Sequence, residues 1–149
     1  MIDCRRPATR AYEASDRTRT RVVMMACLLA LIPPEIRAEP SVTTVAIAIE
    51  RRIFDPSFVT VRSGEPVRLE FQNFDSELHA VIPEHWLKGV NVAVSGNGAP
   101  EFTGSGLHRV VIPSGGHAEL QFTLSRPGIY RYRCDMPGHE MQATIEVRE

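Results

Sequence analysis

From residue 42 to the C-terminus, short apolar runs alternate with clusters of turn-forming residues, and no run has the period of an amphipathic helix. Glycine and proline separate the runs, as at Ser114-Gly115-Gly116 and Pro127-Gly128. The pattern predicts about eight strands, at residues 42–49, 58–62, 67–71, 78–82, 107–112, 118–124, 128–133 and 141–147. Strands of this length and spacing favour an all-β fold, a two-layer antiparallel sandwich.

The first 38 residues have a different composition and predict a secretory signal peptide. Three arginines at positions 17–21 precede an apolar run at 22–32, and Pro33-Pro34 and the small residue Ala38 follow it. The run is too short to cross a bilayer, which takes about 20 residues. We therefore predict cleavage after Ala38, a periplasmic or secreted location, and no integral membrane span in the mature chain. A retained signal that anchors the protein is the alternative.

Removal of residues 1–38 would change both the charge and the thiol content of the chain. It takes away seven of the 17 basic residues and four of the 18 acidic ones, which leaves ten basic and fourteen acidic residues. An acidic chain is a poor ligand for nucleic acid but can dock to a positively charged protein. Cys4 and Cys27 are also lost, so Cys134 has no partner for an intramolecular disulfide and needs another explanation.

Cys134 begins the segment Cys-Asp-Met-Pro-Gly-His-Glu-Met, which connects the last two predicted strands. Alternation in the strand before it places Tyr130, Tyr132 and Cys134 on one face, directed inward. The same rule directs Met141 inward at the start of the next strand. The thiol and the thioether are therefore expected at the same end of the sandwich.

His139 lies on this connection, and His79 lies at the start of an earlier predicted strand. Thiolate and thioether sulfurs favour Cu(I), whereas imidazole also suits Cu(II), so the combined donor set can hold both oxidation states. The donor set predicts a mononuclear copper site that transfers electrons. His117 is in phase with the polar face of its strand and is predicted to be solvated.

These features together resemble the cupredoxin family, the blue-copper proteins of the plastocyanin and azurin type. The resemblance rests on the segment 73–79 that ends in His79, the spacing of Cys134, His139 and Met141, the Phe54-x-Pro56 motif and the 127–130 approach to the cysteine. It implies an eight-stranded Greek-key sandwich over residues 42–149. It also implies one copper ion, with His79, Cys134 and His139 in a trigonal plane and Met141 as a long axial donor.

The family resemblance further implies a monomeric electron carrier that serves redox partner proteins. His139 would lie at the exposed end of the site, inside an apolar rim formed by Met136, Pro137 and residues of the 83–106 segment. That segment is rich in glycine and proline, and the sequence predicts no long regular element in it apart from a turn at 84–87. It is either a functional loop or a surface insertion.

Two positions depart from the family pattern. Only Glu140 separates His139 from Met141, whereas family members usually have a longer spacer, so Met136 or a backbone carbonyl is an alternative axial donor. In several relatives an asparagine follows the first histidine, but here the residue is Ala80. Backbone amides are therefore expected to orient the thiolate.

Other interpretations of the donor set are open. A copper carrier or delivery protein without a redox role is the main alternative, although the chain lacks methionine-rich or histidine-rich tracts. A metal-free interaction domain with the same fold is another. A dinuclear copper centre would need a second cysteine in the loop, and the spacings typical of structural zinc are missing. No oxyanion pocket or substrate cleft is indicated around a cysteine–histidine pair, so we predict no enzymatic activity.

Overall fold

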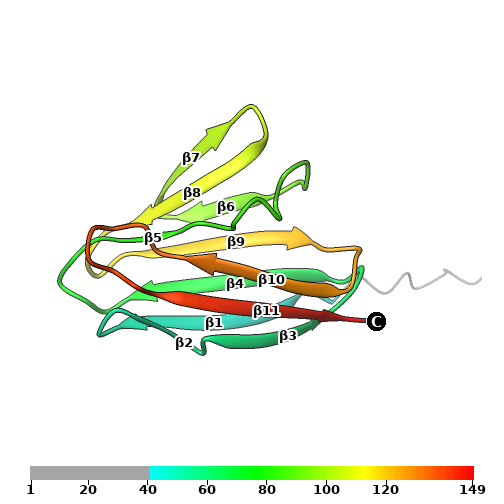
Figure 1. Cartoon of the computed structure of the whole chain (residues 1–149), viewed down its shortest axis with the longest axis horizontal. Coiled ribbons are helices and arrows are strands. Elements are labelled where there is room, and N and C mark those ends of the chain that lie inside the picture. Colours follow the sequence, from blue (N-terminus) through cyan, green and yellow to red (C-terminus); the bar gives the residue numbers. More distant parts are fainter. Residues whose placement is uncertain (1–40) are drawn as a thin grey trace, which may run out of the picture. The chain divides into compact units, whose positions relative to one another are not determined.

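The computed structural model describes residues 41–149, so the predicted signal peptide and its cleavage site lie outside the described residues. This part of the chain forms eleven strands and no helix, and hence no helix able to cross a membrane (Figure 1). The strands are β1 (Thr43–Glu50), β2 (Ile53–Asp55), β3 (Phe58–Arg62), β4 (Pro66–Asn73), β5 (His79–Val81), β6 (Ala93–Gly96), β7 (Ala99–Thr103), β8 (Gly106–Ile112), β9 (His117–Thr123), β10 (Gly128–Arg133) and β11 (Gln142–Arg148).

The strands form two layers, as the sequence predicts. One layer is the sheet β2-β1-β4-β9-β6. The other consists of two three-stranded sheets, β5-β8-β7 and β10-β11-β3. Ile82 and Arg133 join these two sheets through a pair of backbone hydrogen bonds of 2.9 and 3.2 Å. This bridge brings the end of β5 beside the end of β10. His79 is the first residue of β5, and Cys134 directly follows β10.

Two strand pairings differ from the antiparallel arrangement expected from the sequence. β1 pairs with β4, and β3 pairs with β11, in parallel register, whereas the other six pairings are antiparallel. The chain leaves the first sheet after β2, joins the second sheet as β3 and returns as β4. Hydrophobic alternation shows which face of a strand is buried but not the direction of its neighbour, so the sequence could not predict this crossover.

The 83–106 segment is more regular than predicted. The expected turn at 84–87 is present, with Trp86 N donating to Pro83 O at 2.9 Å. The segment also contains β6, which extends the first sheet beside β9, and β7, which pairs with β8. All five residues of β7 are exposed, so the strand has no buried face, and its sequence shows no alternation of apolar and polar residues. β2 was missed because it has only three residues.

The core lies between the two layers and contains three aromatic rings in edge-to-face contact. Tyr132 packs against Phe54 and Phe71 at centroid distances of 5.0 and 5.6 Å. The predicted inward phases are confirmed for Tyr132, Cys134, Ala143, Ile145 and Val147, which are all buried, whereas Tyr130 is only partly buried. Each such large apolar side chain contributes roughly 1.5–3 kcal/mol by its burial. The core therefore fixes the strand ends from which the site is built.

Tyr132 should make the stability of the fold sensitive to alkaline pH. Its hydroxyl is buried without a hydrogen-bond partner, and burial raises the pKa of Tyr132 above its ordinary value. Because the pKa is raised in the folded state, the contribution of the protonated Tyr132 to the free energy of unfolding is complete below about pH 10. Above that pH the free energy of unfolding falls by up to about 1.4 kcal/mol per pH unit. Urea unfolding between about pH 9 and about pH 11.5 should show this slope in the wild type. Tyr132→Phe should lack it and be at least as stable at neutral pH; an unchanged slope would contradict the assignment.

Candidate metal centre

The four residues predicted as ligands come from two connections at one end of the sandwich. Cys134 directly follows β10 and Met141 directly precedes β11, and Cys134 N donates to Met141 O at 3.1 Å. His139 lies between them on a turn in which its own N–H donates to Met136 O at 3.0 Å. His79 is the first residue of β5. The predicted meeting of the cysteine and the methionine at the same end of the fold is confirmed.

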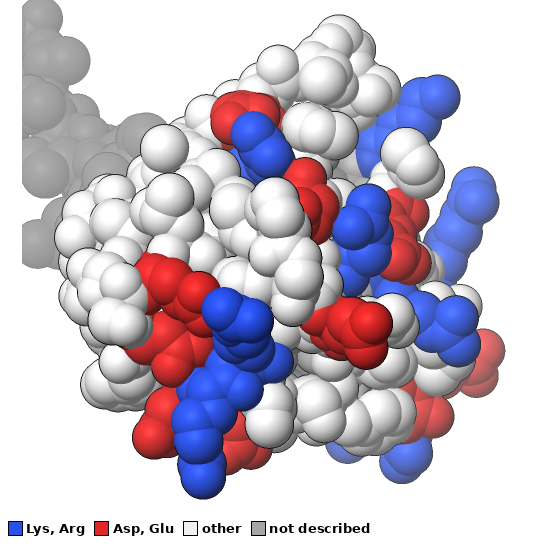
Figure 2. Space-filling model, turned by 60° about the vertical axis from the view of Figure 1, so that its left-hand side comes forward, with Lys and Arg blue, Asp and Glu red and all other residues white. Residues whose placement is uncertain are grey.

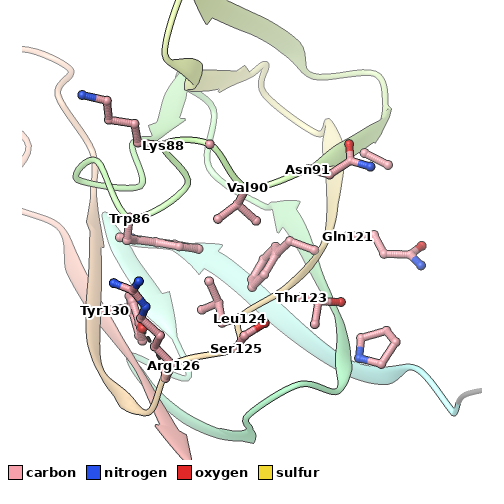
Figure 3. A pocket seen from close by; sticks show the side chains of 14 residues that line it. Trp86, Lys88, Val90, Asn91, Gln121, Thr123, Leu124, Ser125, Arg126 and Tyr130 are labelled. Atoms are coloured by element: carbon pink, nitrogen blue, oxygen red, sulfur yellow. Dashed lines mark hydrogen bonds between the residues drawn. The ribbon is translucent and has the colours of Figure 1, made fainter.

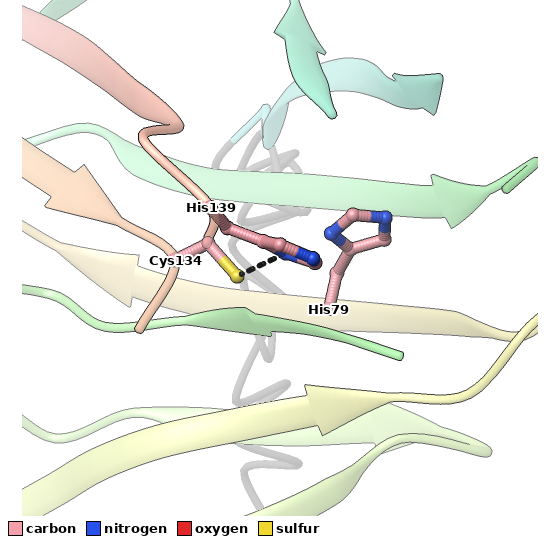
Figure 4. Close-up of side chains that lie close together, drawn as sticks. All are labelled: His79, Cys134 and His139. Atoms are coloured by element: carbon pink, nitrogen blue, oxygen red, sulfur yellow. Dashed lines mark hydrogen bonds between the residues drawn. The ribbon is translucent and has the colours of Figure 1, made fainter. Parts of the chain in front are cut away.

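His79, Cys134 and His139 form a compact cluster (Figure 4). Their ligand atoms all lie within 4.8 Å of one another, and Cys134 Sγ is 3.4 Å from His139 Nδ1. The two imidazole rings are 4.8 Å apart between centroids. Cys134 is 3% exposed and His79 is fully buried. A thiol and two imidazoles so enclosed are typical of a metal site and unusual as packing residues.

The hydrogen bonding of His79 fixes which of its ring nitrogens can bind a metal. His79 Nε2 is 2.9 Å from Asp75 Oδ2. Burial of Asp75 alone would raise its pKa, but hydrogen bonds from Arg52 N, Arg51 N and His79 hold the pKa of Asp75 below its ordinary value. An ionised carboxylate only accepts, so Nε2 carries the proton and Nδ1 keeps its lone pair. Nδ1 is buried without a partner and points toward His139 (Figure 4).

His139 has the same arrangement. Its Nε2 is 3.5 Å from Glu77 Oε2, and its Nδ1 faces the thiol of Cys134. The side-chain hydrogen bond from Arg52 holds the pKa of Glu77 below its ordinary value, so Glu77 is a carboxylate. Each histidine is therefore backed by an acid on the far side of its ring, the outer arrangement common around metal-bound histidines.

A backbone amide orients the thiol, as predicted from Ala80. Ala80 N donates to Cys134 Sγ at 3.3 Å, and this donor would stabilise a thiolate. On the other side of the loop, Asp135 accepts a hydrogen bond from Arg109 Nη1 at 3.1 Å. These contacts tie Cys134 and the residue after it to β5 and β8.

Asn73 anchors the connection that carries His79. Its side chain is fully buried and donates to the backbone oxygens of Glu77, Ile112 and Pro113 at 2.8, 3.2 and 2.9 Å. Its Oδ1 accepts from Asp75 N at 3.0 Å. Asn73 thus holds the 74–78 connection in the shape that places both carboxylates behind the histidines.

Sequence reasoning missed Asn73, Asp75 and Glu77 as members of the site. The 73–79 segment contributes to the family resemblance, but its polar residues received no role of their own, although two acids within four residues of a predicted histidine ligand are a usable signal. Arg52 could not have been found this way, because it lies 25 residues from Glu77 along the chain.

His139 is the least buried of the three candidate ligands, in keeping with its expected place at the exposed end of the site. Its side chain is itself 4% exposed, and the carboxylate of Glu77, which is paired with Arg52, lies 3.5 Å from its Nε2. The apolar rim of Met136, Pro137 and the 83–106 segment stays a prediction. His117 is exposed on the polar face, as predicted.

The axial donor remains a prediction. Met141 is 3% exposed and belongs to the core, whereas Met136 is partly buried against it. Along the chain Met136 lies between Cys134 and His139, and Met141 follows His139. The three other donors suit a single copper ion, because the site offers one soft sulfur and two imidazole nitrogens.

A separate cavity lies away from the metal cluster. It is an open groove of about 850 Å³, lined among others by Trp86, Lys88, Arg126 and Tyr130 (Figure 3). None of the predicted ligands lines it. Trp86 donates its indole N–H to Arg131 O at 2.6 Å, which fixes the ring against β10.

Comparison with known proteins agrees with this fold. No curated protein matches the sequence. Auracyanin A, a blue copper protein of Chloroflexus aurantiacus, is 22% identical at a TM-score of 0.54 and covers 72% of this chain and 100% of its own. Auracyanin B is 21% identical at a TM-score of 0.53, over 76% of this chain and 94% of its own. The metal-binding domain of a Cu(I)-exporting P-type ATPase of Streptococcus pneumoniae D39 is 15% identical at a TM-score of 0.54, over 74% of this chain and 90% of its own.

The family assignment rests on a family model that matches most of the chain. The model of the cupredoxin-like domain matches residues 21–147. The predicted sandwich is present, and one copper ion as the cofactor agrees with the family and with the converging donors. The chain belongs to the cupredoxin-like domain family.

Proposed function

We propose that this chain is an exported protein that binds one copper ion through His79, Cys134 and His139 and carries single electrons between redox proteins. The observation that supports it most strongly is the buried, unpartnered Nδ1 of His79 beside the thiol and the second imidazole. A bound copper ion would supply the Cu(I)/Cu(II) couple. Catalysis of bond-making reactions is not part of the proposal.

The protein's contribution to this function is to keep its donors in place. His79 and Cys134 sit at the ends of β5 and β10, which the Ile82–Arg133 bridge joins. Amide and carboxylate hydrogen bonds fix the thiol and the rings from outside. Donors that move little when the charge of the metal changes require little rearrangement, which favours rapid electron transfer.

The surface around this end of the fold suits transient contact with another protein. Figure 2 shows acidic and basic side chains interspersed on the face that it brings forward, not one large area of a single sign. With fourteen acidic and ten basic residues after position 38, we propose partners with a moderately positive docking surface. We also propose that the protein acts as a monomer.

Cyclic voltammetry of the copper-loaded protein tests the proposed function. A reversible one-electron wave, with copper retained through repeated cycles, is expected for a shuttle. Absence of any wave from fully loaded protein would refute it.

Met141 is the axial donor in this proposal, and its replacement by leucine gives a testable result. Met141→Leu should raise the reduction potential, because an apolar axial side chain leaves the more highly charged Cu(II) with one donor fewer and in more hydrophobic surroundings. Leucine is close in volume, so the fold should lose less than about 1.5 kcal/mol. Voltammetry of Met141→Leu and of Met136→Leu would decide the assignment. A shift only in the Met136 variant would transfer the axial role to Met136.

A copper carrier is the second candidate function, and the likeness to the exporter domain favours it. The two functions differ in the lifetime of the bound metal. A carrier should release Cu(I) rapidly to a competing chelator, whereas a shuttle should retain it. The burial of all three donor side chains supports retention.

A further inference from the structure

The turn between β1 and β2 has an unusual backbone. Arg51 and Arg52 both have positive φ, 54° and 59°, in the left-handed region. Such two-residue hairpin turns normally use asparagine, aspartate and glycine. A residue with a Cβ is disfavoured there, because the Cβ comes too close to the following carbonyl oxygen. Strained backbone of this kind is concentrated at functional sites, where the surrounding structure maintains it.

The contacts of this turn are with the two carboxylates behind the histidines. Arg51 N and Arg52 N both donate to the carboxylate of Asp75, at 2.7 and 3.0 Å. The guanidinium of Arg52 makes a two-point contact with Glu77, with Nη2 2.8 Å from Oε2. The left-handed conformation is what directs two consecutive amides at a single anion.

These contacts continue to both imidazoles. Asp75 accepts from His79 Nε2, and Glu77 lies 3.5 Å from His139 Nε2. Resting on the proposed function, we propose that Arg52 is a positioning residue of the copper centre. Its backbone amide helps to hold Asp75, and its guanidinium holds Glu77 over the edge of His139. One turn thereby keeps the Nδ1 atoms of both histidines on the side of the cluster that holds the thiol before any metal binds.

The two functions of Arg52 can be separated by mutation. Arg52→Gln keeps the amide that binds Asp75 but loses the two-point contact with Glu77. The tautomer of His139 should then be affected, whereas that of His79 should not. Arg52→Lys retains the charge without the planar fork and should give an intermediate result. Glu77→Ala removes the contacting acid itself and should reproduce the effect of Arg52→Gln on His139.

The first test is made on the metal-free protein. Nitrogen-15 NMR of the imidazoles reports which ring nitrogen carries the proton. In the wild type both histidines should be protonated on Nε2 alone. In Arg52→Gln and Glu77→Ala, His139 should become a mixture of tautomers while His79 stays unchanged. A His139 spectrum identical to the wild type in both variants would overturn the proposal.

The second test measures how fast copper leaves the loaded protein in the presence of a chelator. Loss of an outer hydrogen-bond partner typically costs about 10–100-fold in metal affinity, so Arg52→Gln should release copper faster by about that factor. Arg148→Gln is the matched control, because the guanidinium of Arg148 also pairs with a carboxylate, Oε2 of Glu146, at the end of β11 away from Met141. Equal release rates in these two variants would contradict the role of Arg52.

Failure of this proposal is distinguishable from failure of the proposed function. A wild-type protein that binds no copper would refute the function, and the tautomer measurement would still decide the role of Arg52. Normal copper binding with an unaltered His139 in Arg52→Gln would refute only the positioning role.

Discussion

Cys134→Ser is expected to abolish the intense visible absorption of the copper-loaded protein. That absorption arises from charge transfer between a thiolate and Cu(II), and Cys134 is the only thiol in the described part of the chain. Serine is nearly isosteric, and its hydroxyl can accept the hydrogen bond from Ala80 N. The fold should therefore persist while the colour is lost. Absorption spectra of both proteins after saturation with Cu(II) provide the measurement.

The control for this variant is Tyr132→Phe, which alters the same strand two residues earlier. Tyr132 is directed into the core and makes no hydrogen bond through its hydroxyl. Its variant should keep the full absorption. If Cys134→Ser retained the colour, the thiol would not be a ligand and the proposed centre would be wrong.

Asn73→Ala is expected to have the largest effect on stability among the polar substitutions. It leaves the buried carbonyls of Ile112 and Pro113 without their donor and releases Asp75 N. Loss of such buried partners should lower the free energy of unfolding by about 2–3 kcal/mol. The carboxylates behind both histidines should lose their fixed positions as well. Urea unfolding of the metal-free protein gives the stability.

Asn91→Ala is the matched control, because Asn91 is exposed and no hydrogen bond of its side chain is seen in the described residues. Its unfolding free energy should stay within about 0.5 kcal/mol of the wild type. A similarly small change in Asn73→Ala would show that the 74–78 connection is held by other contacts.

Much of the fold and the donor cluster could be predicted because they depend on local patterns. Alternation along β10 and β11 determines that Cys134 points inward where one strand ends and that Met141 does so where the next begins. The connection between them is short, so the sulfurs had to lie near each other. Short strands without alternation, such as β7, leave no such signal.

The outer part of the centre could not be predicted because it depends on contacts between distant segments. Arg52 and Glu77 meet only because β1 and β4 pair in parallel, which places the β1–β2 turn beside the connection after β4. Nothing in the local sequence of either segment specifies that pairing. The acid beside His139 follows from the same pairing, because Arg52 binds Glu77, which lies 3.5 Å from the ring.

The most direct test of the copper centre is a titration of the purified metal-free protein with Cu(II), followed by visible absorption. We predict an intense thiolate-to-copper band that grows linearly and stops at one copper ion per chain. A protein that remains colourless with Cu(II) bound, or that takes up no copper, would contradict the central claim that His79, Cys134 and His139 hold a single redox-active ion.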